Sequence, residues 1–395
     1  MKILHTSDWH LGQSFMGKNR KEEHQAFLAW LIDIIKYEQI NVLIVAGDIF
    51  DTGTPPNYAL ELYYDFLTKL SSSLCENIII TAGNHDSIAT LKAPKQLLKA
   101  LNIHVIASGD ENENELIKIF NKEKFEGIVC AVPFLRDYVL RQSLSAQSVD
   151  DKEYSISQGI KKHYENVYKE ALKLADKQDI PIIATGHLTT LGGKTSESER
   201  EIYIGGTLDI DSSFLGKSFD YVALGHLHVN QKVGCEHVRY SGSPIPLSFS
   251  ESTSQKKVNI IEFKNKIMSV TELNIPLHRP LSVLRGDVTS ILKELETLED
   301  KSAWIEVHLN DENPYYANQV IRKKAEELEL ILLAVKIDKT EKALQAEDFD
   351  VISLDELKPL DLFEKRLQKD GLEDENFIKE LVLNFKKIVS EVQDS

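Results

Sequence analysis

The run NIIITAGNHD at Asn77–Asp86 decides the fold, because an apolar segment ends there in a glycine and a cluster of polar residues. Its first half is typical of a buried strand, and its second half is typical of the loop that follows such a strand. The same order of apolar strand and polar loop occurs at Lys2–Gly12 and at Asn41–Asp51. Amphipathic helical patterns follow the three loops, at 21–38, 56–70 and 87–100. Alternating strands and helices predict an α/β core.

The rest of the first 275 residues extends this core. Apolar strands are predicted at 127–133, 181–185 and 220–224, with a helix near 155–177 between the first two. From 237 to 274 the apolar residues recur with a period close to two, which predicts an antiparallel run. A domain boundary is predicted near Pro276–Pro280, so the core domain would span 1–275.

A small α+β module is predicted at 280–340. It contains strands near 282–284, 303–309 and 330–337 and helices near 288–298 and 315–329. The acidic linker 341–350 separates this module from 351–395, which has the pattern of two short amphipathic helices.

The composition excludes several classes of protein. The 395 residues are 42% hydrophobic, which is ordinary for a globular protein of two or three domains. A net charge of −16 argues against strong nucleic-acid binding by the chain alone. The three cysteines fit neither a disulfide framework nor a zinc cluster and suit a reducing compartment. Because the chain has neither a signal-peptide pattern nor an apolar run long enough for a membrane span, we expect a cytoplasmic protein without membrane contact.

Five short polar motifs each follow a predicted strand. They are Asp8-Trp9-His10, Gly47-Asp48, Gly83-Asn84-His85-Asp86, Gly186-His187 and Gly225-His226-Leu227-His228. Each alone has an ordinary explanation, such as an Asx-turn or a hydrogen-bonded loop histidine. Because an α/β sheet brings the carboxyl ends of its strands to one rim, the whole set predicts a cluster of oxygen and imidazole donors for divalent cations.

The complete set, in this order, resembles the motifs of the calcineurin-like metallophosphoesterases. The longer runs His5–Gly12, Ala46–Asp51, His187–Thr189 and Tyr240–Pro244 are similar to those of the SbcD family of nuclease subunits. The resemblance is strong over about 1–275 and rests mainly on position and size beyond that. It implies a core built as a two-sheet α/β sandwich, a capping domain at 280–340, and C-terminal helices at 351–395 that dock an SbcC-like ATPase subunit.

The resemblance also implies a centre with two divalent metal ions. One ion would be held by Asp8, His10, Asp48 and His228, and the other by Asp48, Asn84, His187 and His226. Asp48 would bridge the two ions, which at a spacing of about 3.5–4 Å can clamp a phosphodiester and generate hydroxide near pH 7. The family implies Mn²⁺, whereas the ligand types alone fit manganese, iron or zinc.

Three residues beside these ligands have predicted roles of their own. His85 follows the ligand Asn84 and resembles the catalytic histidine of the family, which would protonate the leaving oxygen. A loop hydrogen bond is its ordinary alternative. Asp51 and Asp86 resemble carboxylates that fix the tautomers of ligand imidazoles, and each could equally cap the helix that follows it.

The function implied by the resemblance is a manganese-dependent DNA nuclease. It would act as an exonuclease on duplex ends and as an endonuclease on hairpins or single strands, in DNA end processing and repair. The family implies a homodimer within a heterotetramer with the ATPase, and the wide apolar surface of the helix at 56–70 could be core alone or core plus dimer interface. Candidate phosphate contacts are Lys18, Arg20, Lys21, Lys92, Lys95 and Lys99, although such clusters are more often ordinary solvated charges.

Two other functions compete with this one. A phosphatase or small-molecule phosphodiesterase of the same superfamily would use the same ligands, but protein phosphatases of that group carry an arginine in the second motif, and Gly47–Gly53 has none. A non-catalytic scaffold in a repair assembly is the third possibility, and the intact ligand set with His85 argues against it.

Overall fold

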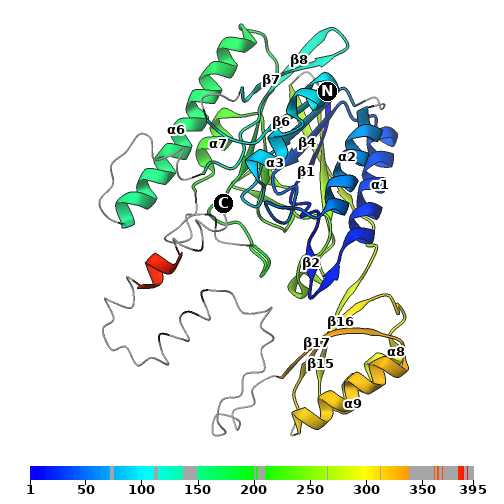
Figure 1. Ribbon diagram of the computed structural model, residues 1–395. Coiled ribbons are helices and arrows are strands. Elements are labelled where there is room, and N and C mark those ends of the chain that lie inside the picture. The colour runs from blue at the N-terminus through cyan, green and yellow to red at the C-terminus, as the bar shows by residue number, and fades with distance from the viewer. Residues whose placement is uncertain are drawn as a thin grey trace. The chain divides into compact units, whose positions relative to one another are not determined.

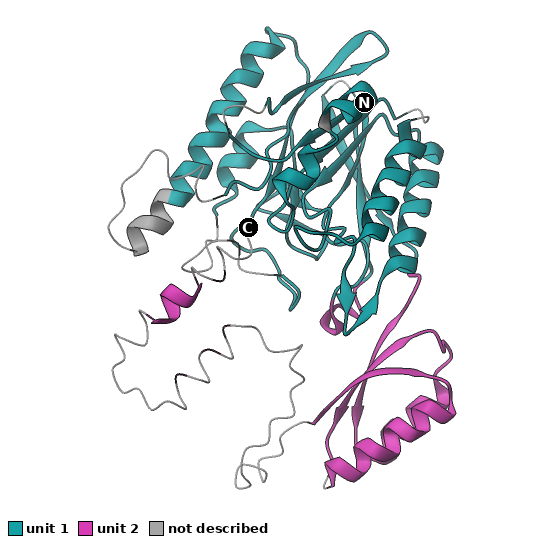
Figure 2. Ribbon diagram, in the orientation of Figure 1, with its two compact units in different colours: residues 1–247, 255–276, 392–395 teal, residues 248–254, 277–391 magenta. Residues whose placement is uncertain are grey.

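The structure is a computed structural model that describes most of the chain up to residue 337. The described residues are 1–71, 75–110, 114–136, 149–199, 202, 210–264, 266–311, 313–337, 360, 363, 367, 381–386 and 389. Contacts divide the chain into two compact units (Figure 2). The larger unit contains 1–247, 255–276 and 392–395, and the smaller unit contains 248–254 and 277–391.

The larger unit contains two six-stranded sheets (Figure 1). The first has the order β14-β13-β1-β4-β5-β6, in which β1, β4, β5 and β6 are parallel and β13 is antiparallel to both of its neighbours. Its strands are β1 (Lys2–Thr6), β4 (Val42–Ala46), β5 (Asn77–Thr81), β6 (Ile103–Ile106), β13 (Lys257–Lys264) and β14 (Ile267–Asn274). A separate two-stranded hairpin joins β2 (Ser14–Phe15) to β3 (Lys18–Asn19).

The second sheet has the order β11-β12-β10-β9-β8-β7. Strands β8, β9, β10 and β12 are parallel, and the two edge strands run antiparallel to their neighbours. The strands are β7 (Leu116–Asn121), β8 (Lys124–Cys130), β9 (Ile182–His187), β10 (Tyr221–Gly225), β11 (Gln231–Val233) and β12 (Cys235–Tyr240).

Three apolar clusters hold these layers together. One cluster lies between the two sheets and is formed by residues such as Ile44 and Ile183. The outer face of the first sheet packs against α1 (Lys21–Tyr37) and α2 (Asn57–Ser71), and that of the second packs against α6 (Val149–Ala175) and α7 (Ser213–Ser218). The shorter helices are α3 (Ile88–Lys92), α4 (Lys95–Ala100) and η1 (Phe249–Glu251). The predicted two-sheet α/β sandwich is therefore confirmed.

The smaller unit contains a parallel three-stranded sheet, β15-β16-β17, with α8 and α9 packed against it. The elements are β15 (Leu281–Gly286), α8 (Val288–Thr297), β16 (Trp304–Leu309), α9 (Pro314–Glu327) and β17 (Ile331–Ile337). Side chains cap both helices, because Asp287 accepts a hydrogen bond from Ser290 N and Asn313 accepts one from Tyr316 N. Since each crossover contains a helix, the strands are parallel, as in α/β proteins rather than in the expected α+β arrangement.

The structure departs from the predicted elements in several places. Strands β6 and β7 were not predicted, and β7 lies at a sheet edge where only alternate residues are buried. The predicted antiparallel run at 237–274 is divided between the sheets, because β12 pairs in parallel with β10 while β13 joins β1. Most of the predicted C-terminal helices at 351–395 lies outside the described residues. No helix in the described part of the chain is long and apolar enough to span a membrane.

Candidate metal centre

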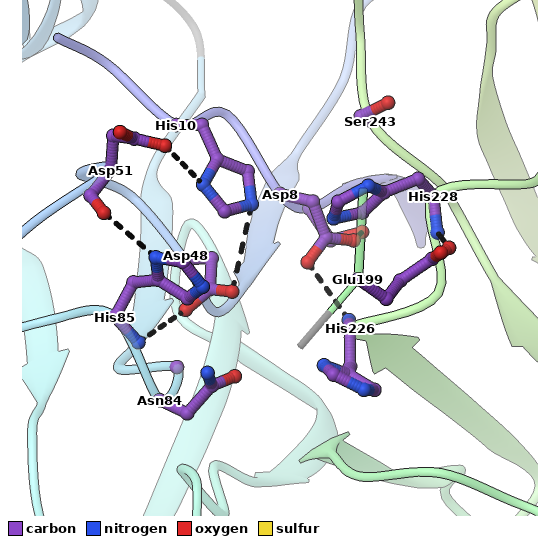
Figure 3. Close-up of polar contacts among 12 residues, drawn as sticks. Asp8, His10, Asp48, Asp51, Asn84, His85, Glu199, His226, His228 and Ser243 are labelled. Carbon is purple, nitrogen blue, oxygen red and sulfur yellow. Dashed lines mark hydrogen bonds and ion pairs between the residues drawn. The ribbon is translucent and has the colours of Figure 1, made fainter. Parts of the chain in front are cut away.

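The candidate site lies where strands of both large sheets end. Strands β1, β4 and β5 belong to one sheet and β9 and β10 to the other, and β4 contacts both β9 and β10. These strand ends and the loops after them carry all the site residues predicted from the sequence, and Figure 3 labels most of them. They are Asp8 and His10 after β1, Asp48 and Asp51 after β4, Asn84, His85 and Asp86 after β5, His187 at the end of β9, and His226 and His228 after β10.

The structure brings the seven predicted ligands into two adjoining groups. Asp8, His10 and His228, which we call the Asp8 group, place one ligand atom each within 4.8 Å of the others. Asp48, His187 and His226, the Asp48 group, do the same. Asn84 adjoins the second group, because its Oδ1 lies 2.9 Å from His187 Nε2. Groups of this composition and spacing can each hold a metal ion.

Asp48 lies between the two groups. Its Oδ2 atom is 3.2 Å from His187 Nε2 in its own group and 3.6 Å from His10 Nε2 in the Asp8 group. The other carboxylate oxygen, Oδ1, accepts a hydrogen bond of 2.9 Å from His85 N. One carboxylate oxygen of Asp48 therefore approaches an imidazole of each group.

The backbone of the site is strained at four of the ligands. Asp8, His10 and Asp48 have φ angles of 52°, 46° and 48°, and His226 has a φ of 99°. Non-glycine residues rarely adopt positive φ, and such conformations cost about 1–3 kcal/mol each and concentrate at functional sites.

Close packing adds a second constraint, because a Cβ at Gly83 would overlap the carboxylate and backbone nitrogen of Asp48. The glycine of the third motif is therefore required by the ligand beside it.

Neighbouring carboxylates control the protonation of His10. Burial alone would lower the pKa of His10, but a hydrogen bond to Asp51 and the charge of Asp48 raise that pKa to about 9. Asp51 Oδ1 lies 3.1 Å from His10 Nδ1. His10 Nε2 on the other side of the ring is buried and makes no hydrogen bond within the described part of the chain.

In the Asp48 group, a carboxylate likewise raises the pKa of a buried imidazole. Burial would lower the pKa of His187, but the charge of Asp48 and their hydrogen bond raise it to about 9. Burial opposes ionisation of Asp48, yet the positive charges of His187 and His85 hold its pKa well below the usual range. By contrast, burial and the charge of His187 hold the pKa of His226 well below its usual value.

These donors fit divalent cations. A buried polar atom without a hydrogen bond costs about 1–3 kcal/mol, and His10 Nε2 is such an atom, directed toward Asp48. A cation would satisfy it and would take over the neutralising role of the protonated imidazoles. Carboxylate, amide and imidazole donors together suit manganese, iron or zinc.

His85 borders both groups. Its Nδ1–H donates to Asp51 O at 2.7 Å, and its ring centroid lies 4.8 Å from that of His10. The residue is only half-buried. The loop hydrogen bond that was its ordinary alternative is therefore present, and it orients the ring without using Nε2.

The comparison with known proteins agrees with this geometry. Residues 1–230 match a family model described as calcineurin-like phosphoesterase. The SbcD subunit of the SbcCD nuclease from Escherichia coli K12 is 40% identical over 387 residues, which cover 95% of this chain and 94% of that protein. The chain belongs to the SbcD family of calcineurin-like phosphoesterases. The family predicted from the five motifs is confirmed.

More distant members of the family cover most of the chain too. The SbcD proteins of Rhodobacter capsulatus and Bacillus subtilis are 35% and 33% identical over 77% and 78% of this chain, and over 76% and 79% of their own lengths. Residues 278–370 match a second family model, described as type 5 capsule protein repressor C-terminal domain.

The contacts of Asp86 differ from both of its predicted roles. Its carboxylate accepts hydrogen bonds from the backbone nitrogens of Ile49, Phe50 and Gly83. The cap of α3 is instead Ser87, whose side chain accepts a hydrogen bond from Thr90 N. Asp86 therefore ties the second and third motif loops together, and within the described part of the chain its carboxylate makes no hydrogen bond to an imidazole.

One of the charged residues after the first motif also differs from expectation. Arg20 was a candidate phosphate contact, but its side chain is fully buried. Its Nε donates to Glu23 at 2.9 Å and its Nη1 donates to Pro246 O at 2.9 Å. Lys18 and Lys21 are exposed. Arg20 therefore holds the loop in place and does not present its charge to a ligand.

Sequence reasoning missed several residues that contact the ligands. Ser7 Oγ donates to Asp8 at 2.6 Å, and Ser198 Oγ lies 2.6 Å from His228 Nδ1. Glu199 accepts a hydrogen bond from His228 N at 2.7 Å (Figure 3). The alternating hydroxyl and carboxylate residues at Ser196–Glu199 were visible in the sequence, but such a run is also typical of a solvated loop.

Proposed function

We propose that this chain is a metal-dependent DNA nuclease, acting as an exonuclease on double strands and as an endonuclease on single strands and hairpins. Its membership of a phosphoesterase family supports phosphodiester hydrolysis, and its relatives are named as the SbcD subunit of the SbcCD nuclease. The observation that carries the proposal is the position of Asp48, whose Oδ2 approaches His10 from one group and His187 from the other.

The proposed centre uses all seven predicted ligands. Asp8, His10, Asp48 and His228 would hold one ion, and Asp48, Asn84, His187 and His226 would hold the other. When bound, the two ions, which we propose to be Mn²⁺, would supply Lewis-acid activation and a hydroxide nucleophile. The close approach of the two groups to one Asp48 oxygen supports this assignment.

We propose His85 as the general acid. Its backbone nitrogen is fixed by Asp48, and its Nδ1–H is fixed by the main-chain carbonyl of Asp51. With Nδ1 held in this way, a protonated His85 would present Nε2–H to the leaving oxygen of the cleaved strand. Transfer of that proton would stabilise the departing alkoxide.

A nuclease assay tests the proposal directly. The purified chain would be incubated with Mn²⁺ and duplex, hairpin or single-stranded DNA, and in parallel with a generic phosphate monoester. We expect Mn²⁺-dependent cleavage of DNA and little hydrolysis of the monoester. Efficient monoester hydrolysis without DNA cleavage would contradict the nuclease assignment.

One observation favours the alternative function, a phosphatase or small-molecule phosphodiesterase. The loop Gly47–Gly53 has no arginine, but Arg136 after β8 reaches the third motif, where its Nη2 donates to Asp86 O at 2.9 Å. A guanidinium at this place could bind the additional charge of a terminal phosphate. If Arg136→Ala lowers monoester hydrolysis and leaves DNA cleavage unchanged, the phosphatase activity is real and separate.

We further propose that an SbcC-like ATPase subunit binds the C-terminal segment 351–395. Among its described residues, the rings of Phe363 and Phe385 stack with centroids 4.1 Å apart and planes at 2°, and Leu367 is buried. Phe363 and Phe385, one from each of the two predicted amphipathic helices, therefore contact each other, which supports one compact docking element.

Deletion of 351–395 tests this partner. The truncated chain should keep Mn²⁺-dependent cleavage of DNA when assayed alone, because all candidate ligands lie before residue 230. It should fail to co-purify with the co-expressed ATPase subunit, whereas the full chain should succeed. Full-strength co-purification of the truncated chain would place the interface elsewhere.

We also propose a homodimer, within a heterotetramer with the ATPase, and a cytoplasmic location. The apolar flank of α2 supports the dimer, because Tyr58, Leu62 and Tyr64 are only half-buried in one chain. The three cysteines are free thiols, as expected in a reducing compartment. Light scattering of the purified chain would measure the dimer, and a monomer at micromolar concentration would contradict it.

A further inference from the structure

The loop that follows β9 is attached to the turn that carries His228. Lys194 N in this loop donates to Gln231 Oε1, and Gln231 Nε2 donates to Lys194 O, both at 2.8 Å; Gln231 is the first residue of β11, which directly follows that turn. Farther along, Ser198 and Glu199 contact His228 itself. The loop is therefore hydrogen-bonded both to His228, a member of the Asp8 group, and to the strand that follows His228.

His228 is held at three of its atoms. Its main-chain nitrogen donates to Glu199 Oε1 at 2.7 Å, and its main-chain oxygen accepts a hydrogen bond from Lys256 Nζ at 3.1 Å. Its ring nitrogen Nδ1 lies 2.6 Å from Ser198 Oγ. Because Nδ1 is engaged with the loop, Nε2 is the nitrogen that would meet an ion together with Asp8 and His10.

The hydrogen bonds of the loop form a chain that starts at Glu199. Ser196 Oγ donates to Glu199 Oε2 at 2.8 Å and lies 2.7 Å from Ser198 Oγ. Ser198 Oγ in turn lies 2.6 Å from His228 Nδ1. The chain therefore runs from a carboxylate through two hydroxyls to the imidazole.

The proton positions along this chain follow from the carboxylate. An ionised carboxylate can only accept, so the single proton of Ser196 Oγ is used on Glu199. Ser196 Oγ must then accept from Ser198 Oγ, which uses the single hydroxyl proton of Ser198. Ser198 Oγ in turn must accept from His228, so His228 carries its proton on Nδ1 and its lone pair on Nε2.

We propose that Ser198 and Glu199 are positioning residues that set the tautomer of His228 for metal binding. The inference rests on the proposed metal centre for its purpose, but the tautomer itself is a property of the metal-free protein. Most metal-binding histidines donate their second N–H directly to a carboxylate or carbonyl, and loss of that partner typically costs 10–100-fold in affinity. Here the carboxylate of Glu199 acts on His228 through the hydroxyl groups of Ser196 and Ser198.

The test uses the full-length chain. Histidine-selective ¹⁵N labelling and long-range ¹H–¹⁵N correlation would report the tautomer without metal, and His228→Gln would identify the resonance. Titration calorimetry with Mn²⁺ would measure the two binding steps. We expect the Nδ1–H tautomer in the unsubstituted protein, and we expect Glu199→Gln and Ser198→Ala to populate the other tautomer and weaken one Mn²⁺ step by about 10–100-fold.

Two controls separate this role from a general effect on folding. Ser198→Thr keeps the hydroxyl and should keep the affinity. Ser250→Ala removes an exposed hydroxyl from the similar run Ser248–Glu251, where Ser248 Oγ lies 2.7 Å from Ser250 Oγ, and should change neither measurement.

Three results would overturn the inference. They are an Nε2–H tautomer in the unsubstituted protein, unchanged Mn²⁺ affinity in both Glu199→Gln and Ser198→Ala, and a folded Ser198→Thr variant as weak as Ser198→Ala. If the unsubstituted protein binds no Mn²⁺, the proposed metal centre fails, and the tautomer measurement still decides this inference.

Discussion

The two ligand groups differ in what orients their imidazoles. In the Asp8 group, side chains do so, because His10 Nδ1 contacts Asp51 and His228 Nδ1 contacts Ser198. In the Asp48 group, the main chain orients His187, whose Nδ1 lies 3.2 Å from Ala46 O at the end of β4. A main-chain carbonyl in a buried strand is set by the fold, whereas a side-chain partner is removed by one substitution. We therefore expect the Asp8 group to be the more easily weakened of the two.

Asp48→Ala should have the largest effect on metal binding, because it should disable both groups alike. The carboxylate approaches imidazoles of both groups, so its loss should abolish binding of both ions and all hydrolysis. Metal analysis after dialysis against Mn²⁺ would measure this, with circular dichroism to check folding. A variant that retains two ions at near-normal affinity would refute the bridging role.

His85→Ala should lower turnover without touching either group. Its side chain is a proposed proton donor and not a ligand, so both Mn²⁺ ions should still bind. We expect kcat for DNA cleavage to fall by about 10²–10⁴-fold, the usual contribution of general acid–base catalysis. Collapse of Mn²⁺ binding in calorimetry would instead identify His85 as a ligand.

Asp51→Ala should weaken metal binding by the Asp8 group alone. It removes the partner of His10 Nδ1 but keeps the main-chain carbonyl that holds His85. One Mn²⁺ step should weaken by about 10–100-fold, and the other should not change. At saturating Mn²⁺, kcat should stay close to normal.

The matched control for this variant is Asp65→Ala, which removes an exposed carboxylate of α2 far from any predicted ligand in the sequence. Equal weakening of both steps in Asp51→Ala would show that the groups are not oriented independently.

The pH dependence should be the smallest effect. Carboxylates raise the pKa of both His10 and His187 to about 9, above the value of about 6.5 in the unfolded chain. The folded metal-free protein therefore binds more protons than the unfolded chain between pH 6.5 and 9, so its free energy of unfolding should fall as pH rises through this window. Below pH 6.5 this contribution should be fully present.

Bound metal should oppose this loss of stability with rising pH, because an ion binds only neutral imidazoles. Thermal unfolding at a series of pH values, with and without Mn²⁺, would show a stabilisation by Mn²⁺ that grows from pH 6.5 to 9. The Asp51→Ala variant should show a shallower loss of stability in the metal-free state, because His10 loses a partner that raises its pKa. A Mn²⁺ stabilisation that declines with rising pH would contradict the assignment.

The sequence by itself determined the α/β core and the rim at which the site lies. Apolar runs that end at Thr6, Ala46 and Thr81 are local signals, because burial of a strand requires apolar residues over its whole length. The five polar motifs are local signals for a similar reason, because each one lies at or just after the carboxyl end of a strand. The resemblance to the calcineurin-like phosphoesterases followed from these motifs, and the resemblance to the SbcD family followed from the longer runs around them.

Only the tertiary structure decided which groups meet. The main-chain contacts of Asp86, the burial of Arg20 and the contact of Ser198 with His228 join residues 30 or more positions apart, or depend on the path of a loop. The pairing of β12 with β10 and the insertion of β13 beside β1 are likewise choices between distant partners. Residue type and periodicity specify how a segment is built and which face it buries, but hydrogen-bond partners across the fold depend on the distances that packing of the two sheets creates.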